Sequence, residues 1–418
     1  MNRYLIIILA ILVGDYLLNL IVDTLNMRHL RTDLPEAFVG YYDGEKYRKS
    51  QEYLKETTRF GFVSDSIATP LTIAFILLGG FNTVDHFARS FHLGNIPTGL
   101  IFAAVLMLLF QMVSIPFSIY STFVIEERYG FNQTTPKTFA LDILKTWILA
   151  AVIGGVLFSG VLWFFEKAGP WAWVWCWMAL TLFQILLLFI APVVILPIFN
   201  KFVPLPKDEL RAAIEAYATT QNFKLKGVFT MDGSKRSTKS NAFFTGFGRF
   251  RRIVLFDTLI EKHTRDELVS VLAHEMGHYK KRHILTSMAI SIITSGFMFF
   301  ILSLFINNRE LFAAFRMDHI SIYASLIFFG FLYSPIEMVL SVFGNMLSRR
   351  HEYEADAFAV DTYQKPESMI SALKKLSVDT LSNLTPHPLK VFLSYSHPPV
   401  LDRIEAIQKH QPGASVSS

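Results

Sequence analysis

The sequence predicts an all-α multispanning membrane protein that carries a small α+β domain. Hydrophobic residues make up 52% of its 418 residues and charged residues only 17%, and the mean hydropathy is +0.38. This composition is too apolar for an ordinary soluble protein. A helix that crosses a bilayer needs about 20 mainly apolar residues. Seven stretches meet this requirement: 4–23, 67–85, 98–125, 143–165, 170–198, 284–306 and 321–346.

The first stretch is predicted to be a retained membrane helix. A signal peptide is the alternative, but the basic flank is weak and no small-residue cleavage site follows the apolar run. Because six further stretches follow, we interpret it as the first of seven spans.

The basic residues between the stretches predict the orientation. With seven spans, the loops after the first, third and fifth lie on the same side as the C-terminus. The first of these loops is rich in Lys and Arg: Arg28, Arg31, Lys46, Arg48, Lys49, Lys55 and Arg59. The opposite side carries fewer: Arg89, Lys167, Arg309 and Arg316. The positive-inside rule then places the large polar segments in the cytoplasm and the N-terminus outside.

The net positive charge of the chain is also explained by basic residues in cytoplasmic loops. A net charge of +5 and a pI near 9.0 suit a nucleic-acid-binding protein, but cytoplasmic loops of multispanning proteins also accumulate Lys and Arg. We favour the second explanation and expect no nucleic acid partner. The single cysteine, Cys176, excludes both an internal disulfide and a Cys-based zinc site. Any metal ion would need His and carboxylate ligands.

Two polar segments, 199–283 and 347–418, are expected to form the α+β domain together. The chain is therefore divided into spans 1–5 (1–198), the first part of this domain (199–283), spans 6 and 7 (284–346) and the second part (347–418). The first part predicts a helix over 207–221, strands over 225–231, 241–247 and 251–256, and a second helix that follows a capping box of Thr264 and Glu267. The tail "PGASVSS" is expected to be disordered.

The segment "VLAHEMGHYKKRH", residues 271–283, contains the string H-E-x-x-H. On a helix, His274 and His278 share one face and can offer ring nitrogens to a single ion. Zinc favours tetrahedral coordination by such nitrogen and oxygen ligands. Glu275 lies about 100° around the helix, so it would flank the ion, in the right place to take a proton from a water molecule. The alternative is a chance occurrence on a solvated helix.

A third ligand is predicted after the seventh span, in "SRRHEYEADAFAV". Catalytic zinc usually has three protein ligands, and Glu352 could complete the set. Asp356 follows four residues later on the same helical face and could hydrogen-bond a ligating His. His351 and Glu354 are competing ligand candidates, and the alternative is a charged solvated helix.

Two further segments carry candidate substrate contacts. In "SNAFFTGFG", residues 240–248, Asn241 and Ala242 would lie at an exposed strand edge that can pair with an extended peptide; an ordinary hairpin is the alternative. In "SYSHPPVLDR", His397 and Arg403 could stabilise the oxyanion of amide hydrolysis. The alternative there is a helix N-terminus with Arg403 in solvent, and the residues alone favour this alternative.

Taken together, H-E-M-G-H before the sixth span, E-Y-E-A-D after the seventh and S-H-P-P near the C-terminus resemble the integral-membrane zinc CAAX prenyl proteases. The resemblance covers essentially the whole chain. It implies seven helices around a water-filled chamber, a thermolysin-like protease domain and one Zn²⁺ per chain. It also implies prenylated peptide or protein C-termini as substrates. The enzyme would lie in a lipid bilayer, that of the endoplasmic reticulum in a eukaryote or the inner membrane in a bacterium, with its protease domain on the cytoplasmic side.

The resemblance also implies the role of each candidate residue. His274, His278 and Glu352 would bind zinc, with Glu275 as general base and Asp356 behind a ligand. His397 and Arg403 would lie near the scissile carbonyl, and Asn241 and Ala242 would form the substrate-binding edge.

Two other functions remain open at this point. A general membrane-protein quality-control protease would share the zinc site but not the prenyl substrate. A cation transporter would use ionisable residues inside the spans, for which Asp15 and Glu337 are candidates. The sequence makes no prediction about the oligomeric state.

Overall fold

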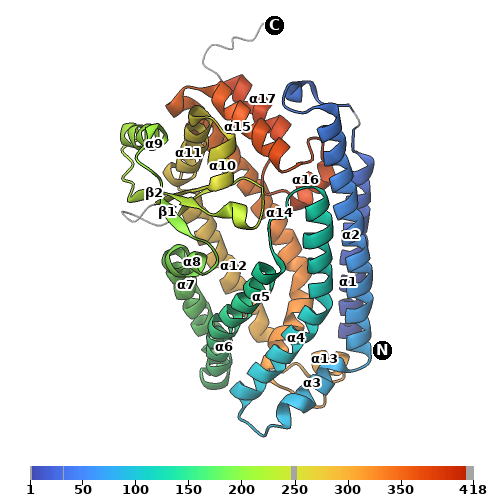
Figure 1. The fold of residues 1–418 in the computed structure, drawn as a ribbon. Coiled ribbons are helices and arrows are strands. Elements are labelled where there is room, and N and C mark those ends of the chain that lie inside the picture. Colours follow the sequence, from blue (N-terminus) through green and yellow to red (C-terminus); the bar gives the residue numbers. More distant parts are fainter. Residues whose placement is uncertain (1, 32, 246–251, 411–418) are drawn as a thin grey trace.

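The computed structural model describes residues 2–31, 33–245 and 252–410 of the chain. Long helices run through most of the molecule, and a small sheet lies near one end (Figure 1). Parts of the second and third predicted strands, 241–247 and 251–256, lie outside the described residues, as does the predicted disordered tail.

Seven of the described helical segments are long and apolar enough to cross a membrane. They are α1 (Arg3–Arg28), α2 (Gly44–Leu77), Asn95–Glu126, Pro136–Lys167, Gly169–Phe199, α12 (His283–Phe305) and α14 (Ile322–Tyr363). Each of the middle three segments contains a short π-helical stretch. α4 (Asn95–Tyr120) continues into the π-helical stretch Ser121–Glu126, and the π-helical stretch Ala150–Gly154 joins α5 (Pro136–Leu149) to α6 (Gly155–Lys167). The π-helical stretch Ala191–Ile195 joins α7 (Ala172–Ile190) to α8 (Leu196–Phe199). The predicted number of spans is confirmed, whereas the enclosed chamber stays a prediction.

The predicted bounds of the second span, 67–85, are wrong. α2 begins far earlier, at a cap in which the Asp43 side chain accepts a backbone hydrogen bond, and it ends before Gly79. Gly79 has a φ of +76° and turns the chain into α3 (Gly80–Arg89). The polar first half of α2 is held by tertiary packing, since Tyr47 is buried in a core with the C-terminal helices. Hydropathy detects only the apolar half.

The seventh helix, α14, extends well beyond its predicted span of 321–346. Glu352 and Asp356 therefore lie on the same uninterrupted helix as the membrane span. The predicted domain boundary between 346 and 347 stays a prediction, and α14 crosses it without a break.

The described strands form one mixed sheet in the order β1-β2-β4-β3. They are β1 (Phe202–Pro204), β2 (Gly227–Met231), β3 (Ala242–Thr245) and β4 (Arg252–Phe256). β2 and β4 are parallel, whereas β1 and β3 pair antiparallel to their neighbours. β3 is an outer strand of the sheet, as the sequence predicts for the segment around Asn241.

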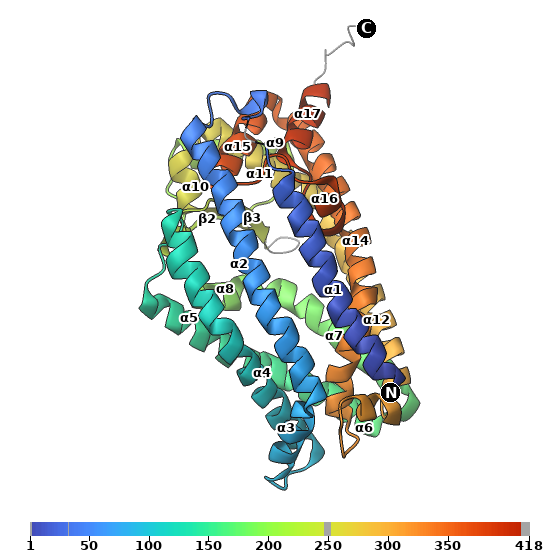
Figure 2. The same ribbon diagram turned by 90° about the vertical axis from the view of Figure 1, so that its right-hand side faces the viewer.

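The remaining helices gather at the two ends of the molecule. Those at the end with the sheet are α9 (Glu209–Thr220), α10 (Asp257–Lys262), α11 (Arg265–Lys280), α15 (Pro366–Asp379), α16 (Pro388–Ser394) and α17 (Val400–His410). α3 and α13 (Arg309–Ala314) lie near the N-terminus at the opposite end (Figures 1 and 2). Single 3₁₀ turns occur at Glu36–Phe38, Gly169–Trp171 and Gly233–Lys235.

The helix α11 begins at the predicted capping box. The Thr264 side chain accepts a hydrogen bond from the Glu267 backbone, and the Glu267 side chain accepts one from the Thr264 backbone. Glu267 is itself buried, where it also accepts hydrogen bonds from Ser371 and Lys375 of α15. These contacts fix the start of α11 within the core formed with the sheet, α9 and α14.

α11 crosses α14 at a glycine. A Cβ atom on Gly277 would lie 3.0 Å from the Cα atom of Ala355 and 3.1 Å from its carbonyl oxygen. Real Cβ atoms rarely come so near a backbone, so the helices can approach this closely only because residue 277 has no side chain.

Replacing Gly277 by Ala should force α11 and α14 apart, because the added methyl group meets backbone atoms that cannot rotate away. We expect a loss of about 1–3 kcal/mol of unfolding free energy, typical of overpacking, measured by thermal unfolding of the purified protein. The matched control is Gly344→Ala on α14, where a Cβ meets nothing within 4 Å. An unfolding temperature as high for Gly277→Ala as for this control would contradict the prediction.

Candidate metal centre

The two motif histidines present ring nitrogens to one point. His274 and His278 are four residues apart on α11, and their Nε2 atoms lie 3.1 Å from each other. Two unprotonated nitrogens at this distance repel unless a proton or a cation lies between them. His274 is buried, whereas the His278 side chain keeps 21% of its exposure, so the site is reached from the side of His278.

Glu352 reaches the same point from α14. Its Oε2 atom lies 3.5 Å from His274 Nε2, and its Oε1 atom lies 3.3 Å from His278 Nε2. One donor atom from each of the three side chains falls within 4.8 Å of the others. The structure thus brings together the three residues that the sequence analysis selected as ligands.

The donor set fits a zinc ion. Two imidazole nitrogens and a carboxylate oxygen are ligands that zinc takes in catalytic sites. Oε2 of Glu352 is buried and accepts no hydrogen bond from the residues that the structure describes, although Nη1 of Arg403 lies 3.2 Å away. With neutral imidazoles, the carboxylates of Glu275, Glu352 and Asp356 outnumber the single guanidinium. A divalent cation would balance this excess negative charge.

Asp356 lies behind His274, as the sequence analysis expects. Its Oδ1 atom is 2.8 Å from His274 Nδ1, which leaves Nε2 free to face the ion. Arg403 of α17 binds both Asp356 oxygens, with Nε to Oδ2 at 2.8 Å and Nη2 to Oδ1 at 2.7 Å. The alternative in which Arg403 is solvated is wrong, because its side chain is buried. Arg403 reaches Glu352 as well, so it connects one candidate ligand, Glu352, with Asp356, which contacts the candidate ligand His274.

His397, unlike the buried Arg403, is exposed. Its side chain is 64% exposed, and its Nε2 atom lies 3.4 Å from Glu352 Oε1. It precedes α17 and stands at the open side of the site. Its position leaves it free to meet a molecule that approaches the three candidate ligands.

The two carboxylates that face His274 set its protonation. Burial lowers the pKa of His274, but the contact with Asp356 and the nearby Glu352 carboxylate outweigh burial and raise this pKa to about 9. A proton here occupies the place that a cation would take, and metal binding would displace it. Burial also raises the pKa of the Glu275 carboxyl above its ordinary value.

Glu275 borders a cavity of about 560 Å³ that His278, His283, His351 and Phe244 also line. Phe244 belongs to β3, which packs against α11. Ala242 and the exposed Asn241 lie at the start of this outer strand, where the Asn241 side chain accepts a hydrogen bond from the Ala242 backbone.

His351 and Glu354, the competing ligand candidates, are not among the converging donors. Asp15 of α1 and Glu337 of α14, which were considered as transport residues, do not belong to this group of donors either. In the part of the chain that the structure describes, the group placed to hold an ion consists of His274, His278 and Glu352. His283, which lies against His278, was not among the site residues predicted from the sequence. The only signal was its place at the end of the quoted motif.

Comparison with known proteins finds two family matches that together span most of the chain. Residues 24–201 match the family described as "CAAX prenyl protease N-terminal, five membrane helices", and residues 204–411 match "Peptidase family M48". The "CAAX prenyl protease 1 homolog" of Arabidopsis thaliana is 36% identical over 383 residues, which cover 90% of each chain.

The chain belongs to the CAAX prenyl protease 1 family. "CAAX prenyl protease 1" of Saccharomyces cerevisiae is 34% identical over 402 residues, 90% of this chain and 88% of the other. The crystal structure of S. mikatae Ste24p matches with a TM-score of 0.93 at 32% identity, covering 97% of this chain and 99% of that one.

Membership in this family confirms the predicted fold class and enzyme class. The protein is a multi-pass membrane metallopeptidase of family M48, for which zinc is the implied ion.

Proposed function

We propose that this chain removes the C-terminal tripeptide from prenylated CAAX proteins at the His274–His278–Glu352 site. The observation that carries the proposal is the convergence of three donor atoms from α11 and α14 beside a cavity that Glu275 lines. His274, His278 and Glu352 would hold one zinc ion per chain. When bound, zinc supplies Lewis acidity that lowers the pKa of water and polarises a carbonyl.

The other residues take roles that follow from their positions. Glu275 accepts the proton of the attacking water and passes it to the leaving amine. Asp356 fixes the tautomer of His274, and Arg403 holds Asp356 in place. Because Arg403 is occupied by carboxylates and His397 is exposed, His397 is the better donor to the developing oxyanion. The outer edge of β3, beginning at Asn241 and Ala242, pairs with the extended substrate.

Replacing Glu275 by Gln should lower cleavage by about 100- to 10,000-fold, the usual contribution of a general base, and leave the zinc content per chain unchanged. Both are measured on purified protein, by peptide cleavage and elemental analysis. His274→Ala should lose zinc and activity together, and Glu405→Gln on the exposed side of α17 should lose neither. Cleavage by Glu275→Gln at the rate of the unmodified enzyme would exclude the assignment.

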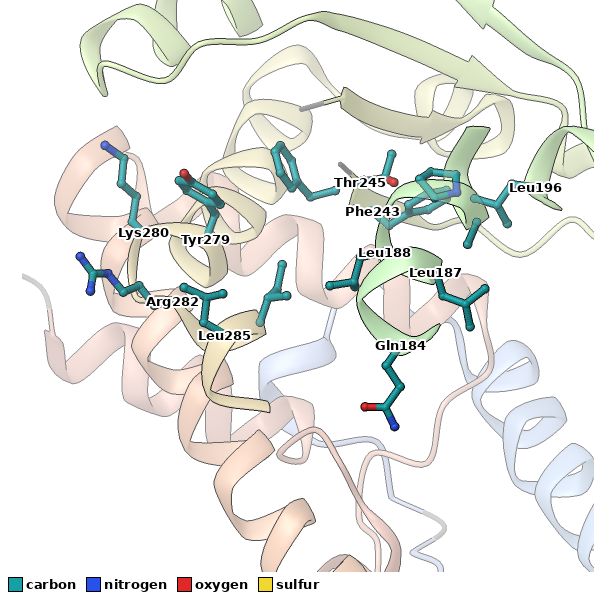
Figure 3. A pocket seen from close by; sticks show the side chains of 14 residues that line it. Gln184, Leu187, Leu188, Leu196, Phe243, Thr245, Tyr279, Lys280, Arg282 and Leu285 are labelled. Carbon is teal, nitrogen blue, oxygen red and sulfur yellow. The ribbon is translucent and has the colours of Figure 1, made fainter. Parts of the chain in front are cut away.

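An apolar pocket beside the site supports a lipid-bearing substrate. This pocket of about 660 Å³ lies between α7, the start of α12 and β3 (Figure 3). It shares Gln184, Leu188, Phe244 and Ile284 with the cavity at Glu275. An isoprenoid carried in this pocket would keep its carbons out of water, worth about 0.8 kcal/mol for each buried methylene group. A peptide attached to it would reach the site by the shared wall.

Leu188→Asn should lower kcat/KM for a farnesylated CAAX peptide about tenfold, because a polar amide replaces an apolar part of the shared wall. Cleavage of the same peptide without the farnesyl group should change little. Leu182→Asn is the matched control, since Leu182 is an exposed leucine on the same helix that lines neither cavity. Equal losses on both peptides would contradict the lipid pocket, and an unmodified enzyme without preference for the farnesylated peptide would favour a quality-control protease.

The end that bears the metal centre is proposed to face the cytoplasm. The basic first half of α2 lies at this end, because its Tyr47 packs with residues of α15 and α17. The N-terminus of α1 lies at the opposite end (Figure 2). The positive-inside rule favours the cytoplasm for the more basic end.

The orientation can be measured with a cysteine at the basic end. Lys49→Cys should react with a membrane-impermeant maleimide only after the cytoplasmic side is opened to the reagent. The native Cys176 is 1% exposed and gives little background. A cysteine at Arg316, at the other end, should label from outside, and the reverse pattern would overturn the proposed orientation.

A further inference from the structure

A second polar chain lies behind the metal centre, separate from Asp356 and Arg403. His278 Nδ1 is 3.0 Å from His283 Nδ1, and His283 Nε2 is 3.1 Å from Glu354 Oε2. Arg350 continues the chain by donating from Nε to Glu354 Oε1 at 2.9 Å. His278 therefore has a carboxylate at the end of a chain on the side away from the ion site, as His274 has Asp356.

The local backbone places His283 for this contact. α11 ends at Lys280, and α12 begins at His283 after Arg282 adopts a φ of +61°. A non-glycine residue in this left-handed conformation costs about 1–2 kcal/mol, so the turn depends on the contacts around it. One of these contacts is the pair of imidazole rings of His283 and His351, which stack at 3.9 Å between centroids and 9° between planes.

The distances allow one consistent proton assignment. If Nε2 of His278 binds a metal ion, its proton must be on Nδ1, which then donates to Nδ1 of His283. A neutral His283 must carry its own proton on Nε2, which donates to the Glu354 carboxylate. In this assignment each donor nitrogen faces an acceptor atom. The proton positions are inferred from these hydrogen-bond partners.

We propose that His283 and Glu354 are positioning residues for His278, holding its Nδ1–H tautomer and its ring so that Nε2 faces the ion. This inference rests on the proposed zinc site and adds to it two residues that are not ligands. Partners of this kind commonly change metal affinity 10- to 100-fold. His283 is buried and Glu354 is partly exposed, so Glu354 can be replaced with less damage to the core.

The test is zinc affinity of the full-length protein in detergent, measured by competition with a chelating dye. His283→Ala should bind zinc about 10- to 100-fold more weakly, because the Nδ1–H of His278 loses its acceptor. His283→Asn should recover most of that affinity, since its amide oxygen can take the position of the ring Nδ1. Glu354→Ala should weaken zinc binding less than His283→Ala does, and Glu354→Gln, which still accepts from His283, should bind normally.

The matched control is His263→Ala, which removes a histidine of similar burial whose Nδ1 contacts the Leu259 carbonyl, not a ligand. It should lower the unfolding temperature without weakening zinc binding. If the unmodified protein binds no zinc, the proposed function fails. If it binds zinc and His283→Ala binds equally tightly, or if His283→Asn is as weak as His283→Ala, the positioning role is overturned while the zinc site stands.

Discussion

The close approach of α11 to α14 is the constraint on which the metal centre depends. Two candidate ligands come from α11 and the third from α14, so their distances are set by how near the helix axes come. Gly277 makes this approach possible, because its missing side chain leaves room for the backbone at Ala355. The capping box and the contacts of Glu267 with α15 then fix α11 along its own axis.

Charge balance imposes a second constraint. Glu352 and Asp356 are both buried, and a buried carboxylate is costly unless it is paired and hydrogen-bonded. Arg403 of α17 contacts both carboxylates and supplies a permanent positive charge beside them, in addition to the histidines of α11. The C-terminal helix is therefore part of the site, together with the two elements that carry the H-E-x-x-H and E-x-x-x-D strings.

The metal centre is also continuous with the membrane region. Glu352 lies on the helix that forms the seventh span, and His283 begins the helix that forms the sixth. No flexible linker separates these residues from the spans. A shift of either span would therefore reach the ligands directly, and a lipid held between α7 and α12 would lie against the same helices that position the site.

What the sequence by itself determined are the features that depend on residues close together along the chain. Apolar runs predicted the spans, Thr264 and Glu267 predicted the start of α11, and spacings of four residues placed His274 with His278 and Glu352 with Asp356. The resemblance to a known family then supplied their roles. The tertiary structure decided which helices meet. It buried Arg403, extended α2 and α14 beyond their apolar parts, and set His283 and Glu354 behind His278. These outcomes arise from packing between elements far apart in the chain, and neither hydropathy nor helical periodicity carries information about such contacts.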